Sequence, residues 1–259
     1  MKVAGCDIGS TAGKAVILQD GIVLSSVIIP CTPNPIKTAT LVMNKAIQEA
    51  GLSSMEEIDY TVGTGYGRLK IPFANENISE ITCHGVGAYW LSPDIRTVID
   101  IGGQDCKVIG LNDEGRVVDF VMNDKCAAGT GKFLEAMCRV LQLTLEDLSA
   151  TSLKSKEPAQ ITNQCSVFIE SEVITLLNEG REIPDVVAGI HQAIAGRLLS
   201  LVRKVGQLER ITVSGGCAKN AGLTKILEEK LGSKMQLLSY DPQFLGALGA
   251  AVLASSKVK

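Results

Sequence analysis

The sequence is short of aromatic residues, and it has no excess of charge of either sign. Its 259 residues include one Trp, four Tyr and five Phe, too few for the aromatic platforms on which single-stranded nucleic acids stack. There are 25 Lys and Arg against 28 Asp and Glu, so the net charge is −3. Such a balance gives no electrostatic footprint for nucleic acid or for an anionic membrane. We therefore expect neither among the partners.

A membrane-spanning run and an export signal are also missing. The apolar runs are all shorter than the length that crosses a bilayer. Only five residues precede Cys6, which leaves no room for the hydrophobic region of a lipoprotein signal. Apolar residues make up 46% and charged residues 20%, an ordinary globular mixture. We expect a reduced, cytoplasmic protein with one large domain or two modest ones.

Closely spaced cysteines are absent, although cysteine itself is not. The eight are Cys6, Cys31, Cys83, Cys106, Cys126, Cys138, Cys165 and Cys217. The closest two are twelve residues apart, which excludes CxxC and the usual zinc and ferredoxin spacings. A disulfide scaffold is not expected in a chain long enough to bury its own core. Taken singly, most of these cysteines should be small buried hydrophobes.

What the sequence does contain is a repeated pattern of strands and glycine turns. Asp7-Ile8-Gly9 aligns with Asp100-Ile101-Gly102, and Lys14 and Lys107 each follow their aspartate by seven residues. The repeat predicts two similar halves that face each other. The expected strands are 3–6, 15–18, 22–29 and three within 97–123, and the expected helices are 35–51, 127–143, 166–180, 185–206, 221–231 and 243–255.

The glycine turns have the composition of phosphate-binding loops. In Gly9-Ser10-Thr11, backbone N–H groups and hydroxyls can close around phosphate oxygens, while Lys14 adds positive charge and Asp7 can hold a hydrated magnesium ion. The second turn offers the same groups in Gly102, Gly103, Gln104 and Asp105, after Asp100. A third Gly-Gly turn lies in VSGGCAKN, 213–220. If the glycines only made tight hairpins, the repeated aspartate would remain unexplained.

Neither a P-loop nor a dinucleotide-binding GxGxxG occurs. Instead, the two hairpin turns, the Gly-Gly turn and the GALGAA segment (246–251) resemble the superfamily of acetate kinases, sugar kinases, Hsp70 and actin. Within it, the chain resembles the ATP-dependent activators (archerases) of 2-hydroxyacyl-CoA dehydratases and the ATPase subunits of benzoyl-CoA reductases. The motifs are TGYGR, ISEITCHG, VIDIGGQDCKVI, MNDKCAAGTGKFLE, CSVFIESEVI, VAGIHQAIAGR and VSGGCAKN.

The resemblance covers essentially the whole chain and implies an α/β fold of two duplicated ribonuclease H-like domains with a nucleotide cleft between them. We assign the first half to 1–95 with the C-terminal helix 245–259. The second half, 96–244, would carry the cluster cysteines and most of the nucleotide site.

The same resemblance implies ATP or ADP with magnesium as a ligand. The expected nucleotide residues are Gly9, Ser10, Thr11, Lys14, Gly102, Gly103, Gln104, Gly129, Thr130, Gly131, Lys132, Gly215, Gly216, Asn220 and Gln243. Asp7 and Asp100 are the expected magnesium residues. Gln104 and Asp105 are the expected catalytic residues, and either could position the attacking water or the metal.

The family's cluster ligands fall on Cys126 and Cys165. Each precedes a predicted helix, whose free N–H groups and positive dipole end would stabilise thiolate and cluster charge. A [4Fe–4S] cluster needs about four thiolates, so two per chain imply one cluster shared across a twofold homodimer. The nucleotide-sensing segment 129–132 lies within one turn of Cys126, which suggests that nucleotide binding is coupled to the cluster. We expect such a cluster to be oxygen-sensitive.

The implied function is ATP-driven transfer of one electron to a (R)-2-hydroxyacyl-CoA dehydratase, with reduced ferredoxin or flavodoxin as donor. The partner could instead be a benzoyl-CoA reductase or a double-cubane cluster reductase. From another class, a small-molecule kinase would use Asp124 as its base, although the chain has no long insertion to build a sugar site. A non-catalytic nucleotide-dependent regulator is the remaining alternative.

Overall fold

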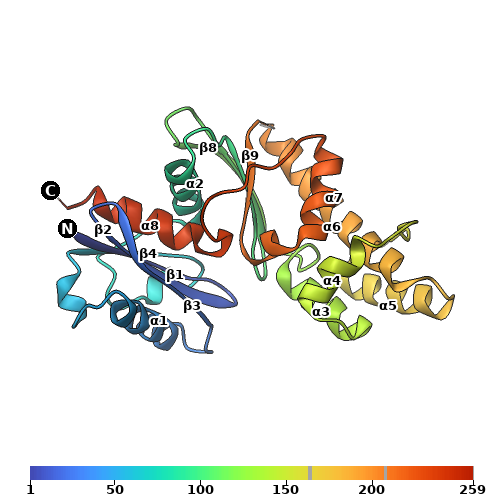
Figure 1. The fold of residues 1–259 in the computed structure, drawn as a ribbon, viewed down its shortest axis with the longest axis horizontal. Coiled ribbons are helices and arrows are strands. Elements are labelled where there is room, and N and C mark those ends of the chain that lie inside the picture. The colour runs from blue at the N-terminus through green and yellow to red at the C-terminus, as the bar shows by residue number, and fades with distance from the viewer. Residues whose placement is uncertain (163–164, 207–208, 259) are drawn as a thin grey trace. The chain divides into compact units, whose positions relative to one another are not determined.

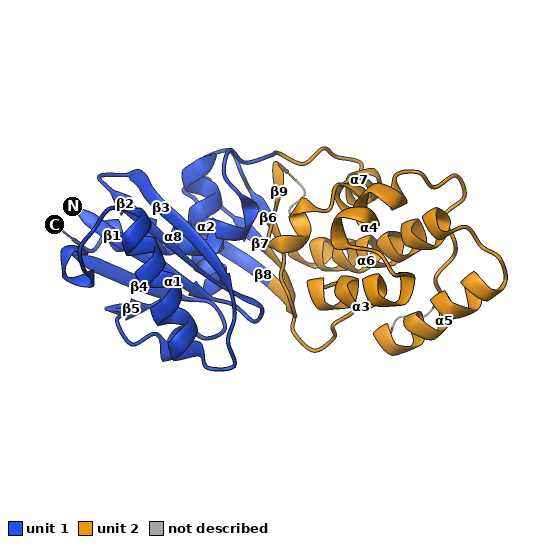
Figure 2. Ribbon diagram, turned by 60° about the horizontal axis from the view of Figure 1, so that its bottom comes forward, with its two compact units in different colours: residues 1–98, 109–120, 237–259 blue, residues 99–108, 121–236 orange. Residues whose placement is uncertain are grey.

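The computed structural model describes residues 1–162, 165–206 and 209–258, and it is an α/β structure with two sheets (Figure 1). The contacts within the chain define two compact units (Figure 2). Unit 1 contains 1–98, 109–120 and 237–259, and unit 2 contains 99–108 and 121–236. These units are not identical to the division expected from the sequence, because 96–98, 109–120 and 237–244 belong to unit 1.

Unit 1 contains a five-stranded sheet in the order β3-β2-β1-β4-β5. Strand β1 pairs antiparallel with β2 and parallel with β4. The turn from β2 to β3 uses Asp20 and Gly21, both at positive φ, as in the tightest hairpins. The elements of unit 1 outside the second sheet are β1 (Lys2–Ile8), β2 (Ala12–Gln19), β3 (Ile22–Pro30), α1 (Pro35–Glu49), β4 (Tyr60–Thr64), β5 (Glu76–Asn77), α2 (Glu80–Leu91) and α8 (Leu245–Ser255).

Helices cover both faces of this sheet because its strands are apolar on both sides. Ala4, Cys6 and Ile8 form a buried cluster with residues of α1. Val3 and its same-face neighbours on β2 and β4 form another with the alanines of α8. Figure 1 shows α1 and α8 on opposite sides of the strands. The alternation of faces along β1 follows the two-residue period of a strand.

The second sheet repeats the topology of the first, in the order β8-β7-β6-β9. Its strands are β6 (Thr97–Ile101), β7 (Cys106–Leu111), β8 (Val117–Asn123) and β9 (Ile211–Ser214). The first three strands of each repeat therefore lie in the same order, and the fourth lies beside the first. The duplication predicted from the sequence is confirmed in the strand order.

The remaining helices of unit 2 pack around a core of their own. They are α3 (Gly131–Leu141), α4 (Leu145–Ser152), α5 (Ser166–Asn178), α6 (Ile183–Val205) and α7 (Ala221–Leu231). The predicted helices 185–206 and 221–231 are confirmed to within two residues. The prediction of one helix over 127–143 is wrong at its start, because 127–130 form a turn closed by Thr130 N–H to Ala127 O at 3.0 Å. The sequence analysis did not predict α2 or α4.

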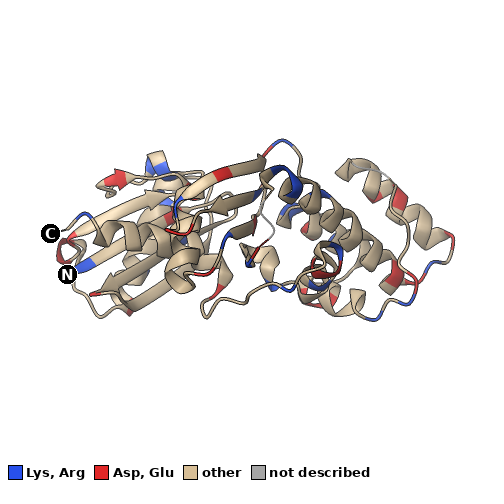
Figure 3. Ribbon diagram, turned by 90° about the horizontal axis from the view of Figure 1, so that it is seen from above, with Lys and Arg blue, Asp and Glu red and all other residues tan. Residues whose placement is uncertain are grey.

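Helix α6 is long and apolar enough to cross a membrane by length and composition, with 56% of its most apolar window buried inside the protein. This corrects the expectation that no segment reaches that length. Its buried residues belong to the core of unit 2, which accounts for the apolar composition. Basic and acidic positions are interspersed along the ribbon (Figure 3), in keeping with the net charge of −3.

Candidate functional site

The first glycine turn joins β1 to β2 and holds a buried ion pair. Asp7 is 4% exposed, and its Oδ2 lies 3.1 Å from Lys14 Nζ. The turn is closed by Gly9 N–H to Ala12 O at 3.1 Å. Gly65 packs so closely on Asp7 that a Cβ there would overlap the carboxylate. The aspartate at the strand end is thus held in place by the lysine seven residues later.

The second turn, between β6 and β7, repeats these contacts. Lys107 Nζ lies 3.2 Å from Asp100 Oδ2, and Gly102 N–H donates to Asp105 O at 3.0 Å. The aligned positions therefore carry the same ion pair and the same turn hydrogen bond in both halves. Local sequence spacing sets this geometry, because residues Asp7 and Lys14 face each other in the register of β1 and β2.

Two further contacts are described at the second turn. Lys107 Nζ also lies 2.9 Å from Asp105 Oδ2, and Ser214 Oγ donates to Asp100 Oδ1 at 2.8 Å. One buried ammonium therefore holds two carboxylates. Both oxygens of Asp100 have direct protein partners, so its predicted role with magnesium fits an ion that keeps its water shell better than direct ligation. Sequence reasoning missed Lys107 and Ser214 as site residues, although the repeat had already paired Lys107 with Lys14.

The third glycine turn and the start of α3 close onto the second turn. Gly215 has φ +83°, and a Cβ there would overlap Ile101 O, so only glycine fits the approach. Gly131 N–H donates to Gly102 O at 2.9 Å, and Lys132 N–H donates to Gly103 O at 2.8 Å. The expectation of free N–H groups in the first turn of α3 is therefore wrong. Those N–H groups instead tie α3 to the glycine turn.

The other expected nucleotide residues fall on both units. Gly9, Ser10 and Thr11 form the β1–β2 turn, and Gln243 lies in the 3-10 helix Pro242–Phe244 of unit 1. Gln104 is exposed in the second turn. Gly129, Thr130, Gly216 and Asn220 belong to unit 2. Asn220 is already engaged, because its Oδ1 caps α7 by accepting from Leu223 N–H at 2.9 Å and its Nδ2 lies 3.2 Å from His191 Nε2.

The eight cysteines differ in exposure and in the environment of their thiols. All eight are free. Burial raises the thiol pKa of Cys83 to about 12, of Cys106 to about 11 and of Cys217 to about 12. It also raises the pKa of Cys6, Cys31 and Cys138. Cys126 is half-buried, and Cys165 is exposed. A high pKa keeps a thiol protonated and inert, so the six raised thiols are poor ligands.

Cys126 lies in a short segment between β8 and α3 that side chains hold in place. Asn123 Nδ2 donates to Cys126 O at 3.3 Å. Arg197, on α6, donates from Nη1 to Cys126 Sγ at 3.7 Å. The Arg197 Nη2 is buried and has no partner among the described residues. Sequence reasoning missed Arg197 and Asn123, although Arg197 ends the motif VAGIHQAIAGR and Asn123 lies in MNDKCAAGTG.

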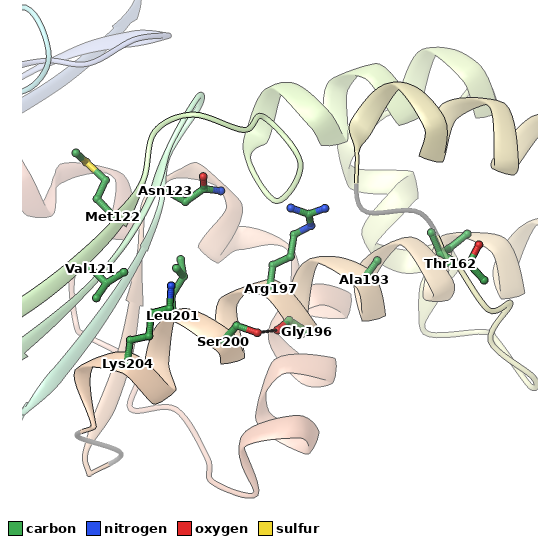
Figure 4. A pocket seen from close by; sticks show the side chains of 11 residues that line it. Val121, Met122, Asn123, Thr162, Ala193, Gly196, Arg197, Ser200, Leu201 and Lys204 are labelled. Atoms are coloured by element: carbon green, nitrogen blue, oxygen red, sulfur yellow. Dashed lines mark hydrogen bonds between the residues drawn. The ribbon is translucent and has the colours of Figure 1, made fainter.

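A pocket of about 520 Å³ lies beside this segment, within unit 2. Arg197, Ser200 and Lys204 line it from α6, and Asn123 lines it from the end of β8 (Figure 4). Thr162 contributes from the segment that leads toward Cys165. The described lining includes two cations and no carboxylate.

Cys165 is the residue directly before α5, as the sequence predicted. Glu172, one and a half turns into that helix, accepts from Thr162 N–H at 2.8 Å and from Thr162 Oγ1 at 2.6 Å. The side chains beside Cys165, those of Val167 and Phe168, are 67% and 61% exposed. Within the described residues, no group of three or more His, Cys, Asp and Glu could hold a metal ion. One chain thus offers Cys126 and Cys165 as two candidate ligands rather than a complete ligand set.

Asp124, the base of the kinase alternative, has a local partner, and Arg68 and His191 also have structural surroundings of their own. Asp124 pairs with exposed Lys125 at 2.8 Å, and the Lys125 hydrogen bond lowers the pKa of Asp124, which weakens it as a base. Arg68 Nη1 donates to Gly65 O at 3.1 Å and so closes its own loop. Burial lowers the pKa of His191 to about 4.

Comparisons with known proteins agree with this architecture. The chain is 41% identical over 261 residues to the 2-hydroxyisocaproyl-CoA dehydratase activator of Clostridioides difficile, covering all of this chain and 97% of the relative. It is 43% identical over 256 residues to the activator of lactoyl-CoA dehydratase of Anaerotignum propionicum, covering 98% and 97%.

Two solved structures, one with high and one with low sequence identity, resemble this chain. The activator of the 2-hydroxyisocaproyl-CoA dehydratase from Clostridium difficile, with bound ADPNP, matches with TM-score 0.93 at 40% identity, over 100% of this chain and 98% of that one. A ROK hexokinase from Thermus thermophilus matches over both whole chains with TM-score 0.54 at 16% identity, which shows a shared fold alone. The predicted actin-like fold is confirmed.

The family follows from the sequence match. The model of the BadF/BadG/BcrA/BcrD ATPase family matches residues 4–254, nearly the whole chain, and the two activators named above cover 100% and 98% of it. The chain belongs to the BadF/BadG/BcrA/BcrD ATPase family.

Proposed function

We propose that the protein is an ATP-dependent activator that delivers one electron at a time to a (R)-2-hydroxyacyl-CoA dehydratase. Three relatives that are 41% to 43% identical over 96% or more of both chains are dehydratase activators. A benzoyl-CoA reductase subunit is 33% identical over 85% of this chain, so the comparison favours a dehydratase over a benzoyl-CoA reductase or a double-cubane cluster reductase as the partner. Reduced ferredoxin or flavodoxin would supply the electron. We also propose a cytoplasmic location, because all eight cysteines are free.

The cofactor proposal rests on one observation, the contrast between half-buried Cys126 and exposed Cys165 and the six other thiols, whose pKa is raised by burial. Cys126 and Cys165 would provide two ligands to a [4Fe–4S] cluster, and the same pair from a second copy would provide the other two. The buried and unpartnered Nη2 of Arg197 beside Cys126 fits a site whose occupant brings an acceptor. The cluster, when bound, supplies a one-electron redox centre.

The nucleotide would act through the second glycine turn. Gly102 and Gly103 accept hydrogen bonds from the first residues of α3, so a movement of this turn displaces α3 and the segment that holds Cys126. Nucleotide can influence electron transfer only by binding two conformations with different affinity. We propose that ATP hydrolysis, with magnesium near Asp7 and Asp100 and with Gln104 and Asp105 as catalytic residues, drives that difference.

Anaerobic purification followed by iron, sulfide and mass analysis tests the proposal. We expect a homodimer with about four irons, and bleaching of the cluster in air. Cys126→Ala and Cys165→Ala should each abolish iron binding and electron transfer. Cys31→Ala is the matched control, since Cys31 is as half-buried as Cys126 but has a raised thiol pKa. Full iron content in either ligand variant would contradict the ligand assignment.

The kinase alternative and the activator predict different results when Asp124 is changed. If the protein transfers phosphate to a small-molecule hydroxyl, Asp124→Asn should lower turnover by about 100-fold or more, as for loss of a general base. If it is an activator, ATP hydrolysis should survive this change. The exposed pair between Asp124 and Lys125 favours survival.

A further inference from the structure

Arg197 is placed unusually for a partly buried cation. Its Nη1 donates to Cys126 Sγ at 3.7 Å, across 71 residues of sequence. A neutral thiol is a weak acceptor, and a desolvated guanidinium without an anion is costly. Among the described residues no carboxylate accepts from it, and its Nη2 is buried without a partner. An anionic group at Cys126 would give this guanidinium the partner that it lacks.

The aliphatic stem of Arg197 lies near Gly129. Gly129 has φ +104°, and a Cβ at that position would lie 3.8 Å from Arg197 Cδ. Arg197 therefore contacts the segment 126–130 at the sulfur of Cys126 and passes close to Gly129. At its other end this segment is tied to the second glycine turn through Gly131 and Lys132. A change in that turn thus alters the position of Cys126 relative to Arg197.

We infer that Arg197 is a positioning residue that holds the Cys126 ligand sulfur and raises the reduction potential of the cluster bound there. The inference rests on the proposed function. A hydrogen bond and a positive charge at a ligand sulfur stabilise the reduced cluster, which carries one more negative charge, so they raise its potential. If nucleotide-driven movement of the segment weakens this contact, the bound electron leaves at a lower potential.

The test compares three variants of the full-length protein, purified anaerobically. Arg197→Gln removes the charge and the paired donors, and Arg197→Lys keeps the charge but not the planar fork. Lys204→Gln is the control, because Lys204 lies two turns further along α6 and lines the same pocket. The readouts are the midpoint potential of the cluster, followed by its visible and EPR spectra, and the rate of iron loss to a chelator.

The inference predicts a more negative midpoint potential for Arg197→Gln than for the parent. Iron loss should be about tenfold faster, since outer partners of metal ligands typically contribute about 10- to 100-fold in affinity. Arg197→Lys should lie between, and Lys204→Gln should match the parent. Circular dichroism and ADPNP binding report whether each variant is folded.

Different failures have different meanings. An unchanged potential in Arg197→Gln overturns the inference and leaves the proposed function intact, as does an equal shift in Lys204→Gln. If Arg197→Gln does not fold, a parental potential in Arg197→Lys overturns the inference. A parent protein that binds no iron overturns the proposed function and the inference with it.

Discussion

At the scale of single residues, the site depends on lysine–aspartate ion pairs at equivalent positions in the two halves. Lys107 is 1% exposed and contacts both Asp100 and Asp105. Lys14, its counterpart in the first half, has one carboxylate partner among the contacts described and is 15% exposed. The two lysines occupy equivalent positions but differ in burial.

Removing Lys107 should destabilise the protein more than removing Lys14. Lys107→Met leaves buried Asp100 without its cation, and breaking a buried pair from one side costs about 3–5 kcal/mol. Lys14→Met should lower the free energy of unfolding by less, because solvent partly compensates the charge of Asp7. Urea unfolding of both variants measures the difference, and equal losses would contradict the role given to Lys107.

His191 should make stability depend on pH. Its pKa falls from 6.5 to about 4 on burial, so the unfolded chain binds more protons between these values. Stability is therefore lost as pH falls from 6.5 toward 4, by about 3 kcal/mol. His191→Gln places a neutral side-chain amide near Asn220, so this pH-dependent part of the stability should vanish. Unfolding free energies of both proteins between pH 6.5 and pH 4 check the prediction. If the two proteins lose stability in parallel, His191 is not the source of the pH dependence.

At the scale of elements, close contacts between backbones decide how helices pack. Helices α2 and α8 cross where Gly87 faces Leu245 and Gly249 faces Cys83, and a Cβ on either glycine would overlap a backbone carbonyl. The small-residue composition of 243–255 predicted such packing. The start of α3 was not predicted in this way. The sequence predicted a helix over 127–143, but 127–130 form a turn.

Gly249→Ala should therefore loosen unit 1. The added methyl forces α8 away from α2, at about 1–3 kcal/mol. Gly196→Ala, in α6, is the matched control, since nothing lies within 4 Å of its added Cβ. That variant should be neutral or more stable by about 0.4–1 kcal/mol. Thermal unfolding compares the two, and a harmless Gly249→Ala would disprove the close helix contact.

At the scale of the whole molecule, the duplicated halves place an aspartate, a glycine turn and a lysine in each repeat. A ligand that binds the folded protein stabilises it by mass action. Magnesium ADPNP at 100 times its dissociation constant should therefore add about 2.7 kcal/mol to the unfolding free energy. Differential scanning fluorimetry over a nucleotide titration measures this stabilisation. A melting temperature independent of nucleotide would contradict the assigned nucleotide site.

The sequence by itself determined the features that depend on local spacing. The Asp–Lys pairs, the turn closure from Gly9 to Ala12 and the helix start after Cys165 all involve residues within seven positions, so backbone geometry decides them. The similarity to a known family also needed no structure. These local features account for the two glycine turns and for the helix start after Cys165, whereas the choice of Cys126 and Cys165 came from the family resemblance.

Only the tertiary structure decided contacts between distant segments. Ser214 meets Asp100 across 114 residues, and Arg197 meets Cys126 across 71. The start of α3 was mispredicted because Gly131 and Lys132 donate to a turn almost thirty residues earlier, a partner that helical periodicity does not reveal. Residues 109–120 belong to unit 1 although the segments on either side belong to unit 2, because strands β7 and β8 pass from one unit to the other. Such partners depend on how the chain folds back on itself, which composition and period leave open.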